Sequence, residues 1–223
     1  MTEKPKNNQS VSIVLLLTIA GLTLAALGVI FFLSVFDPCG EAGCDGPGPA
    51  RATPSDFTGI TAIEPAQDVA DFTLTDQNGE SVSLSELRGK PTLIFFGFTH
   101  CPDLCPTTLI EYRKIYETVG KDQVNFVFVS VDGSRDTPDV LKQYFETSRV
   151  PYVIGLTGDL DVVLKAGAPF NLVAEHGPMY ESGIYDVTHT SSIFILNREG
   201  QLVAKYAYGT LLDVMIEDVR TRL

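Results

Sequence analysis

The hydrophobic pattern divides the chain into an apolar N-terminal run, a stretch without periodicity, and a long region of alternating strand and helix patterns. Residues 11–36 form 26 consecutive positions without a charged side chain. As a helix, such a run extends about 39 Å, which exceeds the roughly 30 Å hydrocarbon core of a bilayer. A cleaved signal peptide has a shorter apolar region of about 7–15 residues, so the run predicts one transmembrane anchor.

The charges on either side of this run predict its orientation. Residues 1–10 carry Lys4 and Lys6, whereas the positions after Phe36 are acidic or uncharged until Arg51. Positive residues remain on the cytoplasmic side of a membrane, so the tail is expected in the cytoplasm. The tail lacks the Arg-rich amphipathic pattern of a mitochondrial transit peptide. The rest of the chain is therefore expected on the outer, periplasmic side of a bacterial inner membrane, where disulfides are permitted.

Residues 37–68 show no sustained periodicity and are dense in glycine and proline. This composition predicts a flexible tether. Cys39 and Cys44 lie within it, and a local disulfide between them is the expected role.

The pattern from residue 69 to residue 223 predicts one α/β domain. Continuous apolar runs at 92–98 and 124–131 are typical of buried central strands. Alternation around Asn78-Gly79 predicts a hairpin over residues 72–84, and a second hairpin is expected over residues 192–206.

Helical apolar stripes follow the strands. They predict helices from Pro106 to about Val119, from Thr137 onward, from Asp159 to Lys165, and from Thr210 onward, with Thr210 capping the last. Strand and helix alternate and are followed by a hairpin and a helix, which is the order of a thioredoxin-like domain with a central mixed sheet flanked by helices. Residues 168–188 form an expected insertion before the second hairpin.

The charge of the chain narrows its possible partners. The formal net charge is −12, and no basic patch follows residue 10. Binding to a phosphate backbone requires clustered Lys and Arg, so a nucleic-acid partner is not expected.

Cys101 and Cys105 carry the first candidate chemistry. They are four positions apart at a predicted strand-to-helix junction, which directs both thiols the same way with Cα atoms about 6 Å apart. At that distance the two can form a disulfide or share one metal ion. The helix N-terminus is expected to favour the thiolate form. Two soft thiolates at one point select a soft ion such as Cu(I).

His189 is the expected third ligand. It precedes the strand at Ile193, a position that faces the cysteine pair across the tip of a thioredoxin-like sheet. Two sulfurs and one imidazole suit copper in either oxidation state. His100 is expected to point to the opposite side of the strand end, with a ligand role as the less favoured alternative. His176 is expected to be solvated. Asp132 could orient His189 or a partner, but capping of a turn is the commoner role of Asp.

Three segments resemble the signature of the Sco/SenC family of copper proteins. They are residues 97–109 (GFTHCPDLCPTTL), residues 131–138 (VDGSRDTP, with Gly133 where the family has Pro) and residues 185–192 (YDVTHTSS). The resemblance covers the domain from about residue 69 to 223, and nothing in it extends to Cys39 or Cys44.

The resemblance implies one copper ion per chain, bound by Cys101, Cys105 and His189. It also implies a metallochaperone that helps to build the binuclear copper centre of cytochrome c oxidase subunit II, with other copper chaperones as further partners. Such a protein needs no catalytic residue and no organic cofactor.

Other functions use the same residues. A thiol–disulfide reductase would use Cys101 and Cys105 as its redox pair, although such enzymes usually have Cys-x-x-Cys and a proline where Thr190-Ser191-Ser192 stands. A peroxiredoxin is excluded, because the threonine and proline expected before its reactive cysteine are absent here. A redox or copper sensor remains an alternative.

Overall fold

The computed structural model of the chain describes residues 58–120, 122–180 and 184–223. The predicted tail, the predicted anchor and most of the predicted tether, with Cys39 and Cys44, lie outside these ranges. Within the three ranges, no helix is both long and apolar enough to cross a membrane.

One mixed sheet of eight strands forms the centre of the domain, in the order β1-β10-β9-β4-β5-β6-β2-β3. Strands β4, β5 and β6 are parallel to one another, and the other neighbours are antiparallel. The strands are β1 (Ile60–Asp68), β2 (Thr73–Asp76), β3 (Ser81–Ser83), β4 (Thr92–Gly97), β5 (Asn125–Ser130), β6 (Ile154–Thr157), β9 (Ile193–Leu196) and β10 (Gln201–Tyr206). The predicted mixed sheet and both hairpins are confirmed.

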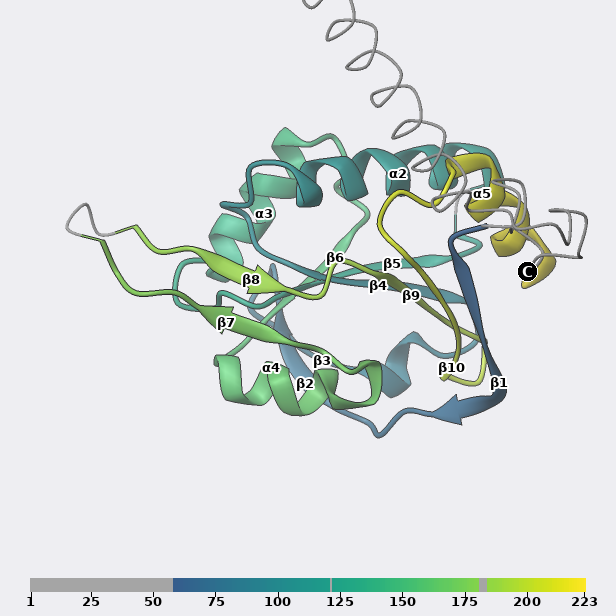
Figure 1. Ribbon diagram of the computed structural model, residues 1–223, viewed down its shortest axis with the longest axis horizontal. Coiled ribbons are helices and arrows are strands. Elements are labelled where there is room, and N and C mark those ends of the chain that lie inside the picture. Colours follow the sequence, from purple (N-terminus) through teal and green to yellow (C-terminus); the bar gives the residue numbers. More distant parts are fainter. Residues whose placement is uncertain (1–57, 121, 181–183) are drawn as a thin grey trace, which may run out of the picture. The chain divides into compact units, whose positions relative to one another are not determined.

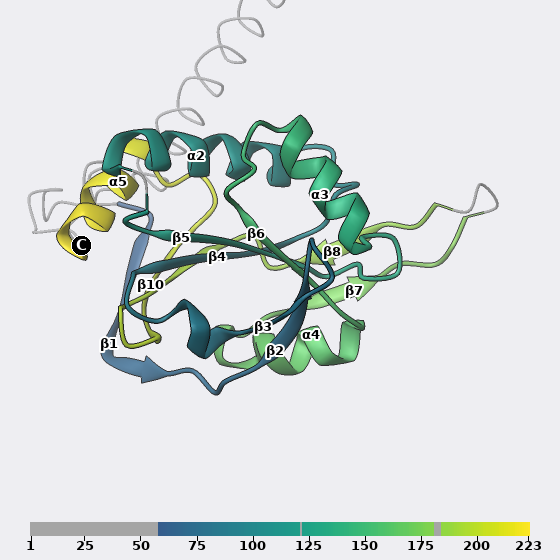
Figure 2. The same cartoon turned by 180° about the vertical axis from the view of Figure 1, so that it is seen from behind.

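Helices cover both faces of this sheet. They are α2 (Leu104–Val119), α3 (Pro138–Thr147), α4 (Leu160–Gly167) and α5 (Leu212–Thr221), with short 3₁₀ turns η2 (Leu84–Leu87) and η3 (Ala168–Phe170). Helices α2, α3 and α5 lie on one side and α4 on the other (Figures 1 and 2). The crossovers β4-α2-β5 and β5-α3-β6 step the same way across the sheet, so the right-handed rule puts α2 and α3 on the same face.

The predicted insertion forms a second, two-stranded sheet. Strands β7 (Ala174–His176) and β8 (Val187–His189) pair antiparallel, with Ala174 opposite His189. In both views the described residues that follow β7 and precede β8 extend beyond the main sheet (Figures 1 and 2). Strand β8 then leads within a few residues into β9, at the edge where β4 ends.

The core fixes the end of β4 in place. All six residues of β4 are buried, and Tyr112 and Ile115 of α2 are fully buried as well. Burying one large apolar side chain contributes about 1.5–3 kcal/mol, so this interface holds the junction of β4 and α2 firmly.

Two details differ from the sequence prediction. Strand β1 pairs with β10, so the folded domain begins by Ile60, inside the segment expected as tether. The register of the β1–β10 pairing shifts between Ala62 and Gln67, so the alternation of apolar and polar residues in β1 is not regular enough to predict a strand. Thr210 does not cap α5: its hydroxyl lies 2.7 Å from the Ala207 carbonyl, and the helix begins after Leu211.

Candidate metal site

Two cysteines lie where β4 passes into α2. Cys101 belongs to the loop between these elements, and Cys105 is the second residue of the helix. The backbone amide of Cys105 donates a hydrogen bond to the Cys101 sulfur, with a nitrogen–sulfur distance of 3.5 Å. The helix begins only at Leu104, so Cys101 lies in a non-helical loop and not in the predicted helical turn, but this loop still brings its sulfur to the N-terminus of the helix that carries Cys105. Neither cysteine is in a disulfide.

His189 completes a group of three donors. It is the last residue of β8, and one ring nitrogen lies within 4.8 Å of the sulfurs of Cys101 and Cys105. The two sulfurs also lie within 4.8 Å of each other. Metal–ligand bonds of about 2.0–2.3 Å put two donor atoms on one ion about 4 Å apart. The side chains therefore fit one small ion after a modest contraction, and the predicted convergence of these three residues is present.

The surroundings of His189 prepare its ring for metal binding. The rings of Phe95 and Phe98 meet it edge-on, with centroids 5.9 and 5.6 Å away. Burial lowers the pKa of His189, so the imidazole is neutral near neutral pH. Its Nδ1 lies 2.9 Å from the Thr190 carbonyl oxygen, an acceptor, and so carries the proton. Nε2 then carries the lone pair that would bind a metal.

The protonation of Cys105 differs from the prediction. The helix N-terminus predicts a thiolate, but Cys105 is 0% exposed and burial raises its pKa far above the ordinary value. Removal from water penalises the charged form more than the helix terminus favours it. Cys101 is 8% exposed, so it is the sulfur that an incoming partner meets first.

Asp136 ties the cysteine loop to the core. It is fully buried in the loop between β5 and α3 and accepts hydrogen bonds from the Thr99 amide (2.9 Å), the Thr99 hydroxyl (2.6 Å) and the Ser130 hydroxyl (2.6 Å). Thr99 lies two positions before Cys101. A buried carboxylate with three donors is strongly held, so Asp136 fixes the backbone that presents this cysteine.

Asp132 ties the histidine hairpin to the same loop. Its fully buried carboxylate accepts hydrogen bonds from the Tyr185 hydroxyl, from Arg135 Nε and from the Ser134 hydroxyl. The guanidinium of Arg135 also stacks 3.8 Å over the Tyr185 ring. Asp132 therefore orients the strand that carries His189 rather than the imidazole itself.

The other two histidines lie outside the group of three. His100 has a side chain 55% exposed, with Nδ1 3.1 Å from the Thr99 hydroxyl. His176 is held more firmly than predicted, because its Nε2 lies 2.9 Å from the Val131 carbonyl oxygen and its ring packs against Tyr185.

Several supporting residues escaped the sequence analysis. Gly97 is one, because a β-carbon at that position would lie 2.8 Å from the Cys105 sulfur. A glycine inside a buried strand is a recognised sign of close approach and could have revealed it. Nothing in the sequence marks Thr99 or Tyr185 in this way, because their hydrogen-bond partners, Asp136 and Asp132, are distant in sequence.

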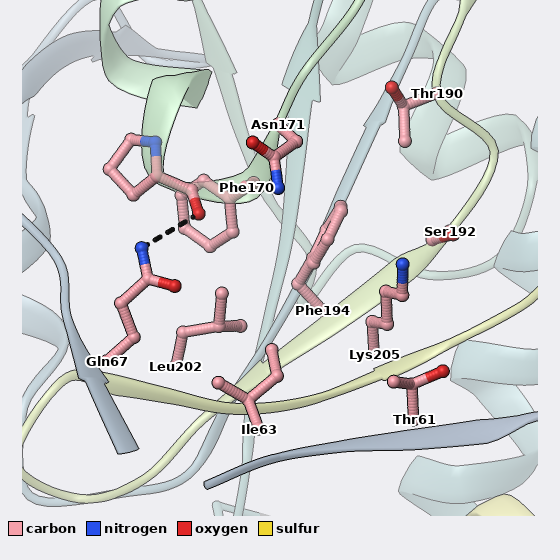
Figure 3. A pocket seen from close by; sticks show the side chains of 11 residues that line it. Thr61, Ile63, Gln67, Phe170, Asn171, Thr190, Ser192, Phe194, Leu202 and Lys205 are labelled. Atoms are coloured by element: carbon pink, nitrogen blue, oxygen red, sulfur yellow. Dashed lines mark hydrogen bonds between the residues drawn. The ribbon is translucent and has the colours of Figure 1, made fainter. Parts of the chain in front are cut away.

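The segment after His189 also borders a hollow of about 280 Å³. Thr190, Ser192 and Lys205 stand at one side of it, and Phe194 and Leu202 form part of its apolar wall (Figure 3). The Thr190 side chain thus lines this hollow while the Thr190 carbonyl holds the His189 ring.

Comparison with known proteins agrees with this geometry. A sequence profile described as SCO1/SenC matches residues 61–223. The structure of Bradyrhizobium japonicum ScoI with copper bound is 39% identical, with a TM-score of 0.63, over 70% of this chain and 99% of that one. The apo Sco1 protein of Thermus thermophilus is 34% identical, with a TM-score of 0.67, over 74% of this chain and 96% of that one.

Among curated proteins, the mitochondrial SCO2 homologue of Danio rerio is 34% identical over 140 residues. The alignment covers 61% of this chain and spans half the length of that relative. The profile matches most of the chain, and the structure has a thioredoxin-like sheet with two cysteines and a histidine at its tip. This chain therefore belongs to the SCO1/SenC family.

Proposed function

We propose that this protein is a copper metallochaperone that carries one copper ion on Cys101, Cys105 and His189. The observation that carries the proposal is the convergence of these three donor atoms within 4.8 Å. Two sulfurs and a neutral imidazole are soft and intermediate donors, which favour copper over hard ions such as Mg²⁺ or Ca²⁺. Copper-bound structures of relatives, among them ScoI of Bradyrhizobium japonicum and Sco1 of yeast, support the same metal.

Each residue has a separate task in this function. Cys101 is the accessible sulfur and exchanges copper with a partner's donor atom. Cys105 is buried and protonated in the metal-free protein, so its proton leaves when the copper–sulfur bond forms. His189 supplies a lone pair without losing a proton. Transfer requires only the exchange of ligands, and no redox step is needed.

The receiving partner in this proposal is the binuclear copper centre of cytochrome c oxidase subunit II. Membership of the SCO1/SenC family supports this assignment, because one related protein, BsSco, is described as a member of the Sco family of cytochrome c oxidase assembly proteins. Residues 11–36 anchor the chain in a bacterial inner membrane, with the copper domain on the outer side. The charge-free run of 26 residues supports this placement.

A thiol–disulfide reductase is the second candidate. The two sulfurs lie within 4.8 Å of each other, close enough to approach bonding distance after a small rotation. The well-placed imidazole favours copper carriage, because a reductase has no need of a third donor.

The test is copper stoichiometry with X-ray absorption on residues 53–223, which form a compact unit. We expect the reduced parent to hold one copper with two sulfurs and one nitrogen, and His189→Ala to lose the nitrogen. Transfer of this copper to the soluble domain of subunit II then tests delivery. A parent without copper, but with a rapidly cycling Cys101–Cys105 disulfide, would make the protein a reductase.

A further inference from the structure

His100 directly precedes Cys101 in the chain, and its side chain is 55% exposed. It borders two open hollows of about 430 and 300 Å³. Phe98 and Pro102 line the larger hollow with it. The Phe98 ring also packs against His189, so this hollow adjoins the three-donor group. The ring of His100 is thus open to a metal ion or a partner, whereas both cysteines are buried.

A chain of hydrogen bonds fixes which nitrogen of His100 is free. Asp136 accepts the hydroxyl hydrogen of Thr99 at 2.6 Å. The Thr99 oxygen has no second hydrogen to donate, so at 3.1 Å it accepts one from Nδ1 of His100. In the neutral ring, Nε2 then carries the lone pair. A histidine held through its other nitrogen by a carboxylate network is the usual arrangement of a metal ligand.

The remaining donors near His100 are already engaged. His100, Asp132 and Asp136 also place donor atoms within 4.8 Å of one another. Both carboxylates are filled by hydrogen bonds from Thr99, Arg135 and Tyr185, which an ion would have to displace. His176 differs from His100, because its Nε2 is bound to a backbone carbonyl. This arrangement leaves His100 as a single, prepared imidazole, suited to hold an ion briefly rather than to form a closed site.

We propose that His100 is an outer copper ligand, at which Cu(I) is captured before it moves to the three-donor site and from which it leaves during hand-over. The inference rests on the proposed copper carriage and adds a kinetic step to it. A bond from Nε2 to copper forms first, as a bond between copper and its donor breaks. The Nε2–copper bond breaks in turn as the Cys101 sulfur binds, and the thiol proton passes to solvent. Copper keeps its oxidation state, so no reductant is required.

The test is stopped-flow uptake of Cu(I), supplied as a chelator complex, by reduced residues 53–223 and by the His100→Gln variant. We expect uptake to slow by about tenfold, within the range over which association rates vary among related variants. The amount of copper bound and the final X-ray absorption spectrum should stay unchanged. The matched control is Gln143→Ala, an exposed residue that borders the smaller hollow, which should keep the parental rate.

A second variant tests the hydrogen-bond chain directly. Thr99→Val keeps the shape of the side chain but removes the bridging oxygen. NMR spectra of the imidazole nitrogens should show the Nδ1–H form of His100 in the metal-free parent and a mixture of forms in this variant, with slower uptake.

Three results would overturn the proposal: equal uptake rates in the parent and His100→Gln, a nitrogen lost from the final spectrum of His100→Gln, or a parental ring without the Nδ1–H form. A parent that binds no copper at all would refute the copper function itself, and the outer-ligand step with it. Copper binding by the parent tests the copper function, and the uptake rate of His100→Gln tests the outer-ligand step, so the two proposals can fail separately.

Discussion

At the residue scale, the space for the Cys105 sulfur depends on Gly97. A β-carbon built on Gly97 would lie 2.7 Å from the Phe95 ring and 2.8 Å from the Cys105 sulfur. Such contacts are closer than atoms in a packed core tolerate. Position 97 therefore requires glycine because the Cys105 sulfur occupies the space of a β-carbon, and not because the backbone conformation is unusual.

The Gly97→Ala variant should lose both stability and copper. Overpacking of this kind costs typically 1–3 kcal/mol, and the displaced sulfur no longer meets the other two donors. Chemical denaturation and competition with a copper chelator measure the two effects. Gly177→Ala is the control, because its β-carbon would have no neighbour closer than 3.4 Å. Parental copper affinity in Gly97→Ala would contradict the close-approach argument.

The burial of Cys105 predicts a pH dependence. Its pKa is raised in the folded protein above the ordinary value of 9.0, so the folded thiol keeps a proton that the unfolded thiol loses. The unfolded state then binds fewer protons, and the stability of the reduced, metal-free protein should fall as the pH rises above about 9. Denaturation midpoints between about pH 8 and 10 measure this fall.

Buried tyrosines with raised pKa values contribute to the same fall at still higher pH. The Cys105→Ser variant isolates the thiol, because serine does not ionise in this range. Its midpoint should decline less between about pH 8 and 10 than that of the parent. Parallel curves for the two proteins would show that Cys105 does not titrate in this way.

At the scale of elements, the loop between β5 and α3 connects the two halves of the site. It carries Asp136, which holds the cysteine loop through Thr99, and Asp132, which holds the β7–β8 hairpin through Tyr185. One short segment thus sets the distance between the sulfurs and the imidazole. The strands and helices were predicted well because their apolar periodicity is local. This connection was not, because hydrogen-bond partners far apart in sequence leave no periodic pattern.

The Tyr185→Phe variant tests the connection to the hairpin. It removes the hydroxyl that donates to Asp132 while it keeps the ring beneath Arg135. Stability should fall by only about 1 kcal/mol, but hydrogen exchange in β7 and β8 should accelerate more than in β4. In the X-ray absorption spectrum of bound copper, the copper–nitrogen distance should become more disordered, while the two copper–sulfur distances stay the same. Uniform acceleration across both sheets would instead mean a general loss of stability.

At the scale of the whole molecule, the order of strands and helices was sufficient to predict a thioredoxin-like domain, and the motifs at its tip predicted which three side chains converge there. The predicted start of the domain is too late, because β1 is an exposed edge strand with an irregular pairing and a weak alternation. The predicted charge of Cys105 is also wrong, since its desolvation depends on tertiary packing, including the close approach of Gly97 to its sulfur.

The three donors differ in how far apart they lie along the chain. Cys101 and Cys105 are four positions apart and stay neighbours in an unfolded chain, whereas His189 follows Cys101 by 88 positions. A nascent or damaged chain can therefore offer two thiols, but only a chain with the hairpin docked against the end of β4 offers the imidazole as well. If the proposed copper site is correct, retention of the metal against a competing chelator would therefore distinguish the folded domain from an unfolded chain.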